Sequence, residues 1–110
     1  MSYTSEHAET EPSREEIDRH VGLLVLEFGA PWCGHCQAIQ ATLAGLLANH
    51  PEVAHLKIYD GRGRPLGRSF RVKLWPTLVF LRDGKVVSRI VRPADEEIAE
   101  SLQALLAPLP

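Results

Sequence analysis

The hydrophobic positions of the chain follow two different periods, and the changes of period predict its elements. Apolar residues fill residues 23–28 almost without interruption, which is typical of a strand covered on both faces, and residues 53–59 form a second strand pattern. Residues 77–81 and 85–91 are two further β-rich runs, and the Asp-Gly pair between them favours a tight hairpin turn. The pattern therefore predicts four strands.

Helices are predicted around and between these strands, over residues 13–20, 33–48, 65–70 and 95–106. Ser13 and Glu16 have the spacing of a capping box, and Asp95 has the position of an N-cap residue. Because a helix separates the first two strands, these strands should be parallel, whereas the hairpin strands should be antiparallel. We therefore predict an α/β fold with a central mixed four-stranded sheet flanked by helices on both faces.

Most of the chain is predicted to form one domain. Residues 1–12 are polar and acidic and show neither period, so we expect a flexible N-terminal segment followed by a single domain over residues 13–110. With 110 residues, 45% of them hydrophobic, the chain can bury a sizeable core. It has no apolar signal region and no run near the roughly 18–20 apolar residues that span a bilayer. We expect a cytoplasmic monomer that does not bind membranes.

The formal net charge is −2, but the charges are unevenly distributed. Nine of the twelve Lys and Arg residues lie between Arg62 and Arg92, where Asp83 is the only acid, so this part of the chain is locally basic. A solvated basic face is the simplest interpretation. We do not expect nucleic-acid binding, because neither interleaved aromatic residues nor a recognised binding module accompanies the charge.

The candidate chemistry lies in the only two cysteines, Cys33 and Cys36, which directly follow the first strand. We place Cys33 at a helix N-terminus, where unpaired N–H groups and the positive end of the helix dipole favour a thiolate. Cys36 lies one turn further on, close enough to form a disulfide, so the pair can act as a two-electron carrier.

Two other interpretations of the pair remain open. The cysteines could be inert buried thiols, or they could form half of a metal or iron–sulfur site shared between two chains. One C-x-x-C supplies only two of the four ligands that a structural zinc needs, and no second such motif is present. We therefore expect no metal site and no cofactor held by this chain alone.

The sequence resembles the thioredoxin family over about residues 17–107. The resemblance is carried by Trp32-Cys33-Gly34-His35-Cys36, Trp75-Pro76-Thr77 and Leu81-x-Asp83-Gly84. It implies a thioredoxin-like fold whose first strand is missing or degenerate here, and a thiol–disulfide oxidoreductase. In this activity Cys33 attacks a disulfide of a client protein and Cys36 resolves the mixed disulfide. A separate disulfide reductase would then recycle the pair.

The resemblance implies roles for residues around the cysteines. Glu27 matches a buried acid that relays a proton for the resolving thiol, and His55 replaces the lysine that often accompanies this acid. His35 makes the motif similar to that of protein disulfide isomerases and would stabilise a Cys33 thiolate. We expect a reduction potential between about −270 mV for thioredoxin and about −180 mV for the isomerase. Ala41 replaces a proline that kinks the family's helix, so a straighter helix is expected.

The resemblance also implies a surface that binds clients. The Trp75–Pro76 peptide bond should be cis and should hold the Trp75 backbone beside the sulfurs, where an extended client segment can pair with it. Trp32 and Gly34 should form part of the same surface, with the two tryptophan rings providing an apolar rim.

Three departures from the family change this rim. Arg92 stands where a glycine is expected, Leu74 replaces a small residue, and Lys73 adds a charge. A bulkier and more basic rim should favour acidic or neutral client segments over basic ones. The same apolar rim would also serve the alternative function, a non-catalytic binding or holdase module.

Overall fold

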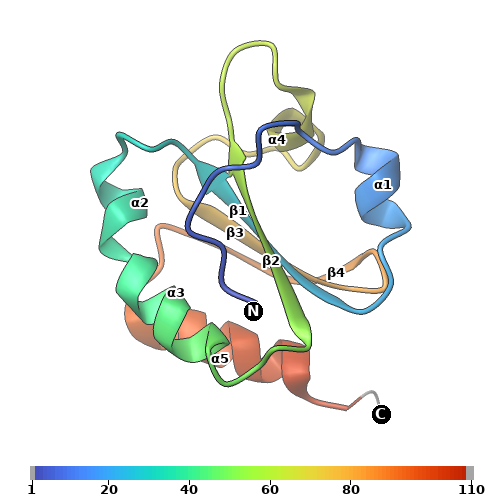
Figure 1. Ribbon diagram of the computed structural model, residues 1–110, viewed down its shortest axis with the longest axis vertical. Helices are drawn as coiled ribbons and strands as arrows, with labels where there is room; N and C mark the ends of the chain where they lie inside the picture. The colour runs from blue at the N-terminus through green and yellow to red at the C-terminus, as the bar shows by residue number, and fades with distance from the viewer. Residues whose placement is uncertain (1, 109–110) are drawn as a thin grey trace.

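The structure, a computed structural model, describes residues 2–108 and has a four-stranded sheet between two layers of helices (Figure 1). The strands are β1 (Leu23–Gly29), β2 (Val53–Tyr59), β3 (Thr77–Arg82) and β4 (Lys85–Val91). The helices are α1 (Arg14–Asp18), α2 (Gly34–Ala38), α3 (Gln40–Leu47), α4 (Pro65–Ser69) and α5 (Asp95–Leu106). The predicted fold class and element order are confirmed.

The strand order in the sheet is β2-β1-β3-β4. Strand β1 pairs in parallel with β2 and antiparallel with β3, and β3 pairs antiparallel with β4, as predicted. Asp83 and Gly84 both have positive φ angles, 51° and 78°, as the predicted tight hairpin turn requires. The central position of β1 brings its carboxyl end, and the cysteine motif that follows, to the middle of one edge of the sheet.

Each face of the sheet carries its own hydrophobic core. Val25 of β1 packs with residues of α3 and α5, whereas Leu24, Leu26 and Phe28 pack on the opposite face with residues of α1 and α4. Successive side chains of a strand point to opposite faces, so burial on both faces explains why β1 is apolar at nearly every position. Glu27 is the exception, and it lies on the face of Val25.

The predicted N-terminal cap is found in α1 but not in α5. Ser13 and Glu16 form the predicted capping box of α1. In α5 the N-cap position belongs to Ala94, so Asp95 is the first helical residue and the predicted N-cap is wrong by one position. The acidic side chains of this first turn still face the positive end of the helix dipole.

The helix predicted over residues 33–48 is divided into α2 and α3 at Ile39, although no proline is present. The carbonyl of Cys36 accepts from the side-chain Nε2 of Gln40 at 2.7 Å and from the backbone N–H of Ile39 at 3.4 Å. A side chain that enters the backbone ladder in this way interrupts a helix. The straighter helix expected from Ala41 is therefore not found.

The N-terminal segment lies against the sheet, whereas its composition predicts a flexible segment over residues 1–12. Ser2 donates from Oγ to the carbonyl of Leu47 at 2.7 Å, and the Ala8 N–H donates to the carbonyl of Lys57 at 2.8 Å. His7 and Lys57 form a single parallel β-bridge. The first strand of the family was expected to be missing or degenerate in this chain, and within the described residues before α1 only this one bridge forms. The contacts that hold the segment are long-range, so local composition does not reveal them.

Candidate active site

Cys33 and Cys36 are free thiols at the start of α2. Cys33 is the N-cap residue of this helix, and its Sγ accepts from the backbone N–H of Cys36 at 3.2 Å. Cys33 is partly exposed, whereas Cys36 is buried with 4% of its surface exposed. The more accessible cysteine receives a backbone N–H and the other is buried, which suits attack by Cys33 and resolution by Cys36.

The surroundings of Cys36 disfavour its thiolate. Burial, a side-chain hydrogen bond to Cys33, the negative charge of Cys33 and, last, that of Glu27 raise the pKa of the Cys36 thiol to about 12. At neutral pH the Cys36 sulfur therefore keeps its proton, and it becomes a nucleophile only when a base removes that proton.

Gly29 provides the space for the buried sulfur. A Cβ atom added at Gly29 would lie 2.4 Å from Cys36 Sγ, closer than such atoms approach each other. The sequence analysis did not identify this residue, because a glycine at the end of a strand has many explanations. Its role becomes visible only when the start of α2 is packed over β1.

Glu27 is buried below the cysteines, with 2% of its surface exposed. Its Oε1 lies 2.9 Å from Nε2 of His55, and its Oε2 accepts from Nε2 of Gln40 at 2.7 Å. Because the same Gln40 amide nitrogen donates to the Cys36 carbonyl, Gln40 connects the carboxylate to the turn that carries the resolving thiol. The structure thus places Glu27 close enough to Cys36 for its charge to act on that thiol.

The N-terminal segment fixes the tautomer of His55. The backbone N–H of Thr4 donates to Nδ1 of His55 at 2.9 Å, so Nδ1 must be an acceptor and the ring proton lies on Nε2. His55 therefore donates its Nε2–H to Glu27 as a neutral imidazole. The ring is held further by stacking on Tyr3, with the centroids 5.3 Å apart, and is 3% exposed.

A buried cation completes this polar network. Lys57 is 7% exposed, and its Nζ donates to Oε1 of Gln40 at 3.1 Å and to the carbonyl of Ser5 at 3.3 Å. Tyr3 donates to the same Gln40 oxygen at 2.6 Å. Sequence reasoning missed Gln40, Lys57 and Tyr3. The one available signal was the spacing of Gln40, which lies four residues after Cys36 and so on the same helix face.

The two tryptophans predicted to bind clients differ in exposure and in the contacts that they make. Trp32 is 67% exposed and contacts the edge of Tyr59, with ring centroids 5.3 Å apart. Trp75 is half-buried, and its Nε1 donates to Oδ2 of Asp60 at 2.9 Å. The Trp75–Pro76 peptide bond is cis, as the resemblance implies.

Gly34 and His35 lie in the first turn of α2, and both are exposed. A Cβ atom at Gly34 would meet no atom within 4 Å, so this turn borders open space. No group of three or more metal-ligating side chains gathers anywhere within residues 2–108.

Arg92 is tied to the irregular segment that leads to the buried Pro76. Its Nε donates to the Trp75 carbonyl at 2.8 Å, and its backbone N–H donates to the Pro76 carbonyl at 2.9 Å. Its φ angle of 47° lies in the left-handed region that favours glycine, which gives a physical reason for the glycine expected at this position. Leu74 is half exposed beside this loop.

The comparisons with known proteins agree with this site. The thioredoxin family model matches residues 5–104. Thioredoxin H-type 1 of Nicotiana tabacum is 35% identical over 86 residues, which cover 78% of this chain and 68% of that protein. Protein disulfide-isomerase A2 of Pongo abelii is 40% identical over 95 residues, covering 67% of this chain and 18% of that protein. The solved structure of thioredoxin 2 from Pseudomonas aeruginosa PAO1 is 51% identical, with a TM-score of 0.82, covering 94% of this chain and 96% of that one. Between residues 2 and 108, no helix has the length and hydrophobicity needed to cross a membrane.

Proposed function

The chain belongs to the thioredoxin family, and we propose that it reduces or exchanges disulfides of client proteins through the Cys33–Cys36 pair. The observation that carries the proposal is a partly exposed Cys33 at the N-terminus of α2 beside a buried Cys36. Cys33 Sγ accepts a backbone N–H at the start of α2, and Cys36 stays protonated below it because its pKa is raised to about 12. Family membership and the C-x-x-C spacing support a thiol–disulfide oxidoreductase.

The reaction has two steps. In the first, the Cys33 thiolate attacks one sulfur of the client disulfide, which forms a mixed disulfide and releases the other client sulfur as a thiolate. In the second, Cys36 loses its proton and attacks Cys33 Sγ, which breaks the mixed disulfide. The client gains two electrons and leaves as a dithiol, and Cys33 and Cys36 are left joined as a disulfide.

Glu27 is proposed as the base of the second step. It is the carboxylate whose charge acts on Cys36, and its two oxygens are held by His55 and Gln40. A base that removes the Cys36 proton during attack avoids forming a free thiolate in a buried site. His55 is a positioning residue in this scheme, because it contacts the carboxylate rather than the reacting sulfurs.

The surface of Trp32, Gly34, Trp75, Pro76 and Arg92 is proposed to bind the client. The exposed ring of Trp32 suits an apolar side chain of the client, and the exposed His35 lies in the same motif. Thioredoxins act on disulfide-bearing client proteins and are recycled by reductases. We propose that a disulfide reductase recycles this chain, that it works as a monomer in the cytoplasm, and that it needs no bound cofactor.

A trapping experiment tests the proposal. Cys36→Ser should accumulate a mixed disulfide with an oxidised client, because the second step is removed while Cys33 still attacks. The adduct should be visible on a non-reducing gel and should be assigned to Cys33 by mass spectrometry. The matched control is the variant with both cysteines replaced by serine, which should form no adduct.

The same experiment separates the proposal from a holdase. If the chain only binds unfolded or extended segments through its apolar rim, the double-serine variant will retain the client as well as the wild type does. That result would replace the enzymatic proposal with the binding one. Measuring the Cys33–Cys36 equilibrium against glutathione then decides direction, since a value near about −270 mV favours reduction and one near about −180 mV favours exchange.

A further inference from the structure

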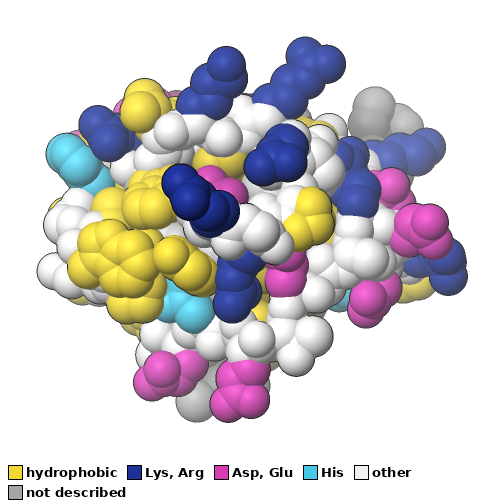
Figure 2. Space-filling model, turned by 90° about the horizontal axis from the view of Figure 1, so that it is seen from above, with side chains coloured by type: hydrophobic (Ala, Val, Ile, Leu, Met, Phe, Trp, Pro, Cys, Tyr) yellow, Lys and Arg dark blue, Asp and Glu magenta, His cyan; other side chains and the backbone are white. Residues whose placement is uncertain are grey.

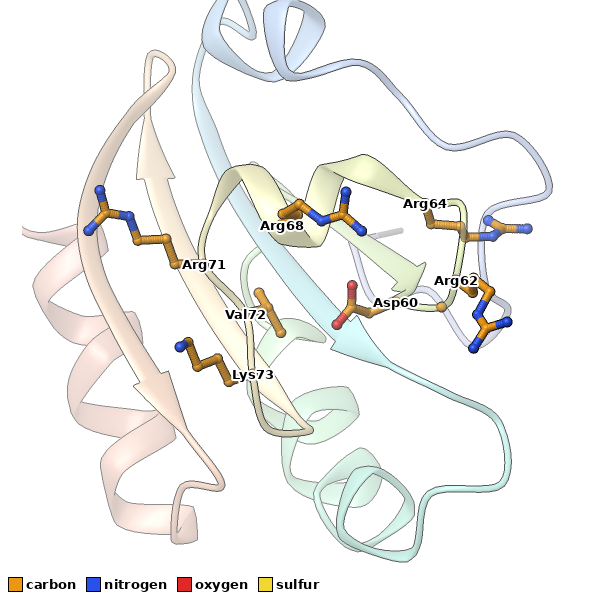
Figure 3. A pocket seen from close by; sticks show the side chains of 8 residues that line it. Asp60, Arg62, Arg64, Arg68, Arg71, Val72 and Lys73 are labelled. Atoms are coloured by element: carbon orange, nitrogen blue, oxygen red, sulfur yellow. The ribbon is translucent and has the colours of Figure 1, made fainter.

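A hollow of about 590 Å³ lies between the end of β2 and the start of β3, and most of the side chains that line it are basic. It is formed by the loop between β2 and α4, by α4, and by the segment that leads to β3 (Figure 3). We call it the basic hollow, and its lining residues are Asp60, Gly61, Arg62, Arg64, Arg68, Arg71, Val72 and Lys73. Five of these eight residues are cations, in a chain whose net charge is −2.

The five cations have no anionic partner in the part of the chain that the structure describes. The ion pairs found over residues 2–108 all involve other residues. The other arginines near the sheet behave differently. Arg14 donates to the Ser69 carbonyl, Arg89 to the carbonyls of Phe70 and Arg71, and Arg92 to that of Trp75. These arginines hold the walls of the basic hollow, whereas none of the five cations that line it forms one of the ion pairs found over residues 2–108, and Arg64 packs on the Tyr59 ring.

The one acid of the basic hollow has a task of its own. Asp60 accepts from the indole N–H of Trp75 at 2.9 Å. It is also packed against α4, because a Cβ atom at Gly67 would lie 2.0 Å from Asp60 Oδ1. In Figure 3 the Asp60 carboxylate lies in the middle, with Arg62 and Arg64 on one side and Lys73 and Arg71 on the other. A single fixed carboxylate leaves a large local excess of positive charge.

The basic hollow is continuous with the surface around the reactive sulfur. Asp60 lines the hollow and accepts a hydrogen bond from Trp75, which precedes the buried Pro76. The Tyr59 ring provides a second link, because it contacts the Trp32 ring and also the Arg64 guanidinium, whose carbon lies 5.0 Å from the centre of the Tyr59 ring. Figure 2 shows one face of the molecule on which Lys and Arg side chains lie beside a hydrophobic patch. A polypeptide whose disulfide meets Cys33 can therefore extend over the basic hollow.

We propose that the basic hollow docks an acidic polypeptide segment that lies next to the disulfide of the client. The inference rests on the proposed function and specifies its substrates as disulfides flanked by Asp or Glu residues. A polypeptide fits better than a small anion, because the five cations come from separate segments and spread around an open hollow. About six extended residues span about 20 Å, which is ample on a molecule of 38 × 30 × 23 Å. Charge complementarity of this kind mainly raises the association rate and selects the partner.

The experiment compares peptides that carry the same disulfide with acidic, neutral or basic flanks of about six residues. The second-order rate constant for reduction should be about tenfold higher for the acidic peptide than for the neutral one at low salt, which is the low end of electrostatic steering. At about 1 M salt, where the Debye length is about 3 Å, the difference should vanish. Replacing Arg62 and Arg68 by Gln should reduce the preference to about twofold or less.

The control variant carries Arg19→Gln and Lys85→Gln, which change the net charge equally. Both residues lie at the opposite end of the sheet from Pro76, where the turn at Gly84 approaches the end of α1. This variant should keep the full preference for the acidic peptide. If both double variants lose the preference for the acidic peptide equally, the proposal is wrong, because the net charge of the protein rather than the basic hollow would then cause that preference.

Two further measurements distinguish the remaining outcomes. Reduction of a small neutral disulfide should be unchanged in the Arg62/Arg68 variant; if no disulfide is reduced even by the wild type, the proposed function itself fails. A single-stranded oligonucleotide should compete no better than an acidic peptide without cysteines. If it competes much better, and the flanks of the substrate have no effect, the basic hollow is a nucleic-acid surface and the inference is wrong.

Discussion

Replacing Glu27 by Gln tests the proton path to Cys36 directly. Both carboxylate oxygens accept hydrogen bonds, one from His55 Nε2 and one from Gln40 Nε2. A glutamine has one acceptor oxygen and one amide NH₂ group. At one of these two contacts its NH₂ group would therefore face the N–H of His55 or of Gln40, and no hydrogen bond could form there. One buried donor left without a partner costs about 1–3 kcal/mol. The variant should therefore remain folded and be less stable by about that amount.

The expected kinetic effect is confined to the second step. With a pKa of about 12, only about one Cys36 thiol in 10⁵ is ionised at pH 7, so unassisted attack on the mixed disulfide is slow. General base catalysis contributes about 10²–10⁴-fold. Removing the Glu27 charge also lowers the pKa of Cys36 and offsets part of the loss, so we expect the second step to slow by about 10²-fold at pH 7.

The assay starts from protein that carries a coloured thiol on Cys33 as a mixed disulfide and follows its release by Cys36. The Glu27→Gln variant should release it slowly at neutral pH, with a rate that rises about tenfold per pH unit because hydroxide has replaced the carboxylate. Formation of the mixed disulfide should be unaffected. Glu52→Gln, an exposed carboxylate at the start of β2, is the matched control and should behave as the wild type. Identical release rates and pH profiles in the Glu27 variant and the wild type would refute the reasoning.

The remaining predictions concern stability. Gly29→Ala should lower the free energy of unfolding by about 1–3 kcal/mol, because its Cβ meets Cys36 Sγ. Gly45→Ala, whose Cβ meets nothing within 4 Å, should raise it by about 0.5–1 kcal/mol. Denaturant titration measures both, and equal effects of the two substitutions would contradict the packing at Gly29. The raised pKa of Cys36 means that the folded protein holds this proton more tightly than the unfolded chain, so the stability of the reduced protein should fall as pH rises from about 9 towards 12. Cys36→Ala should remove that component of the melting-temperature profile, and its persistence would exclude Cys36 as the cause. Ser13→Ala should cost about 1 kcal/mol through the lost cap of α1, measured by thermal unfolding.

The strands, the hairpin and the cysteine motif could be read from the sequence because the causes of each are local. The β-rich composition of β3 and β4 and the Asp83-Gly84 turn depend on residues adjacent in the chain. The break at Ile39 could not be read in the same way. It depends on where the Gln40 amide lies, and that position is set by Glu27 and Lys57 on two other elements.

The sequence by itself determined the order of the elements, the parallel and antiparallel pairing of the strands, and the place of Cys33 at the start of a helix. Only the tertiary structure decided that Tyr3 and Thr4 contact His55 and that Thr4 fixes its tautomer. The same holds for the cations of three segments that line one hollow. The physical reason is the distance along the chain between the partners. Periodicity and capping act within a few residues, whereas these contacts join residues many positions apart, and they exist only when the sheet and its loops have assembled.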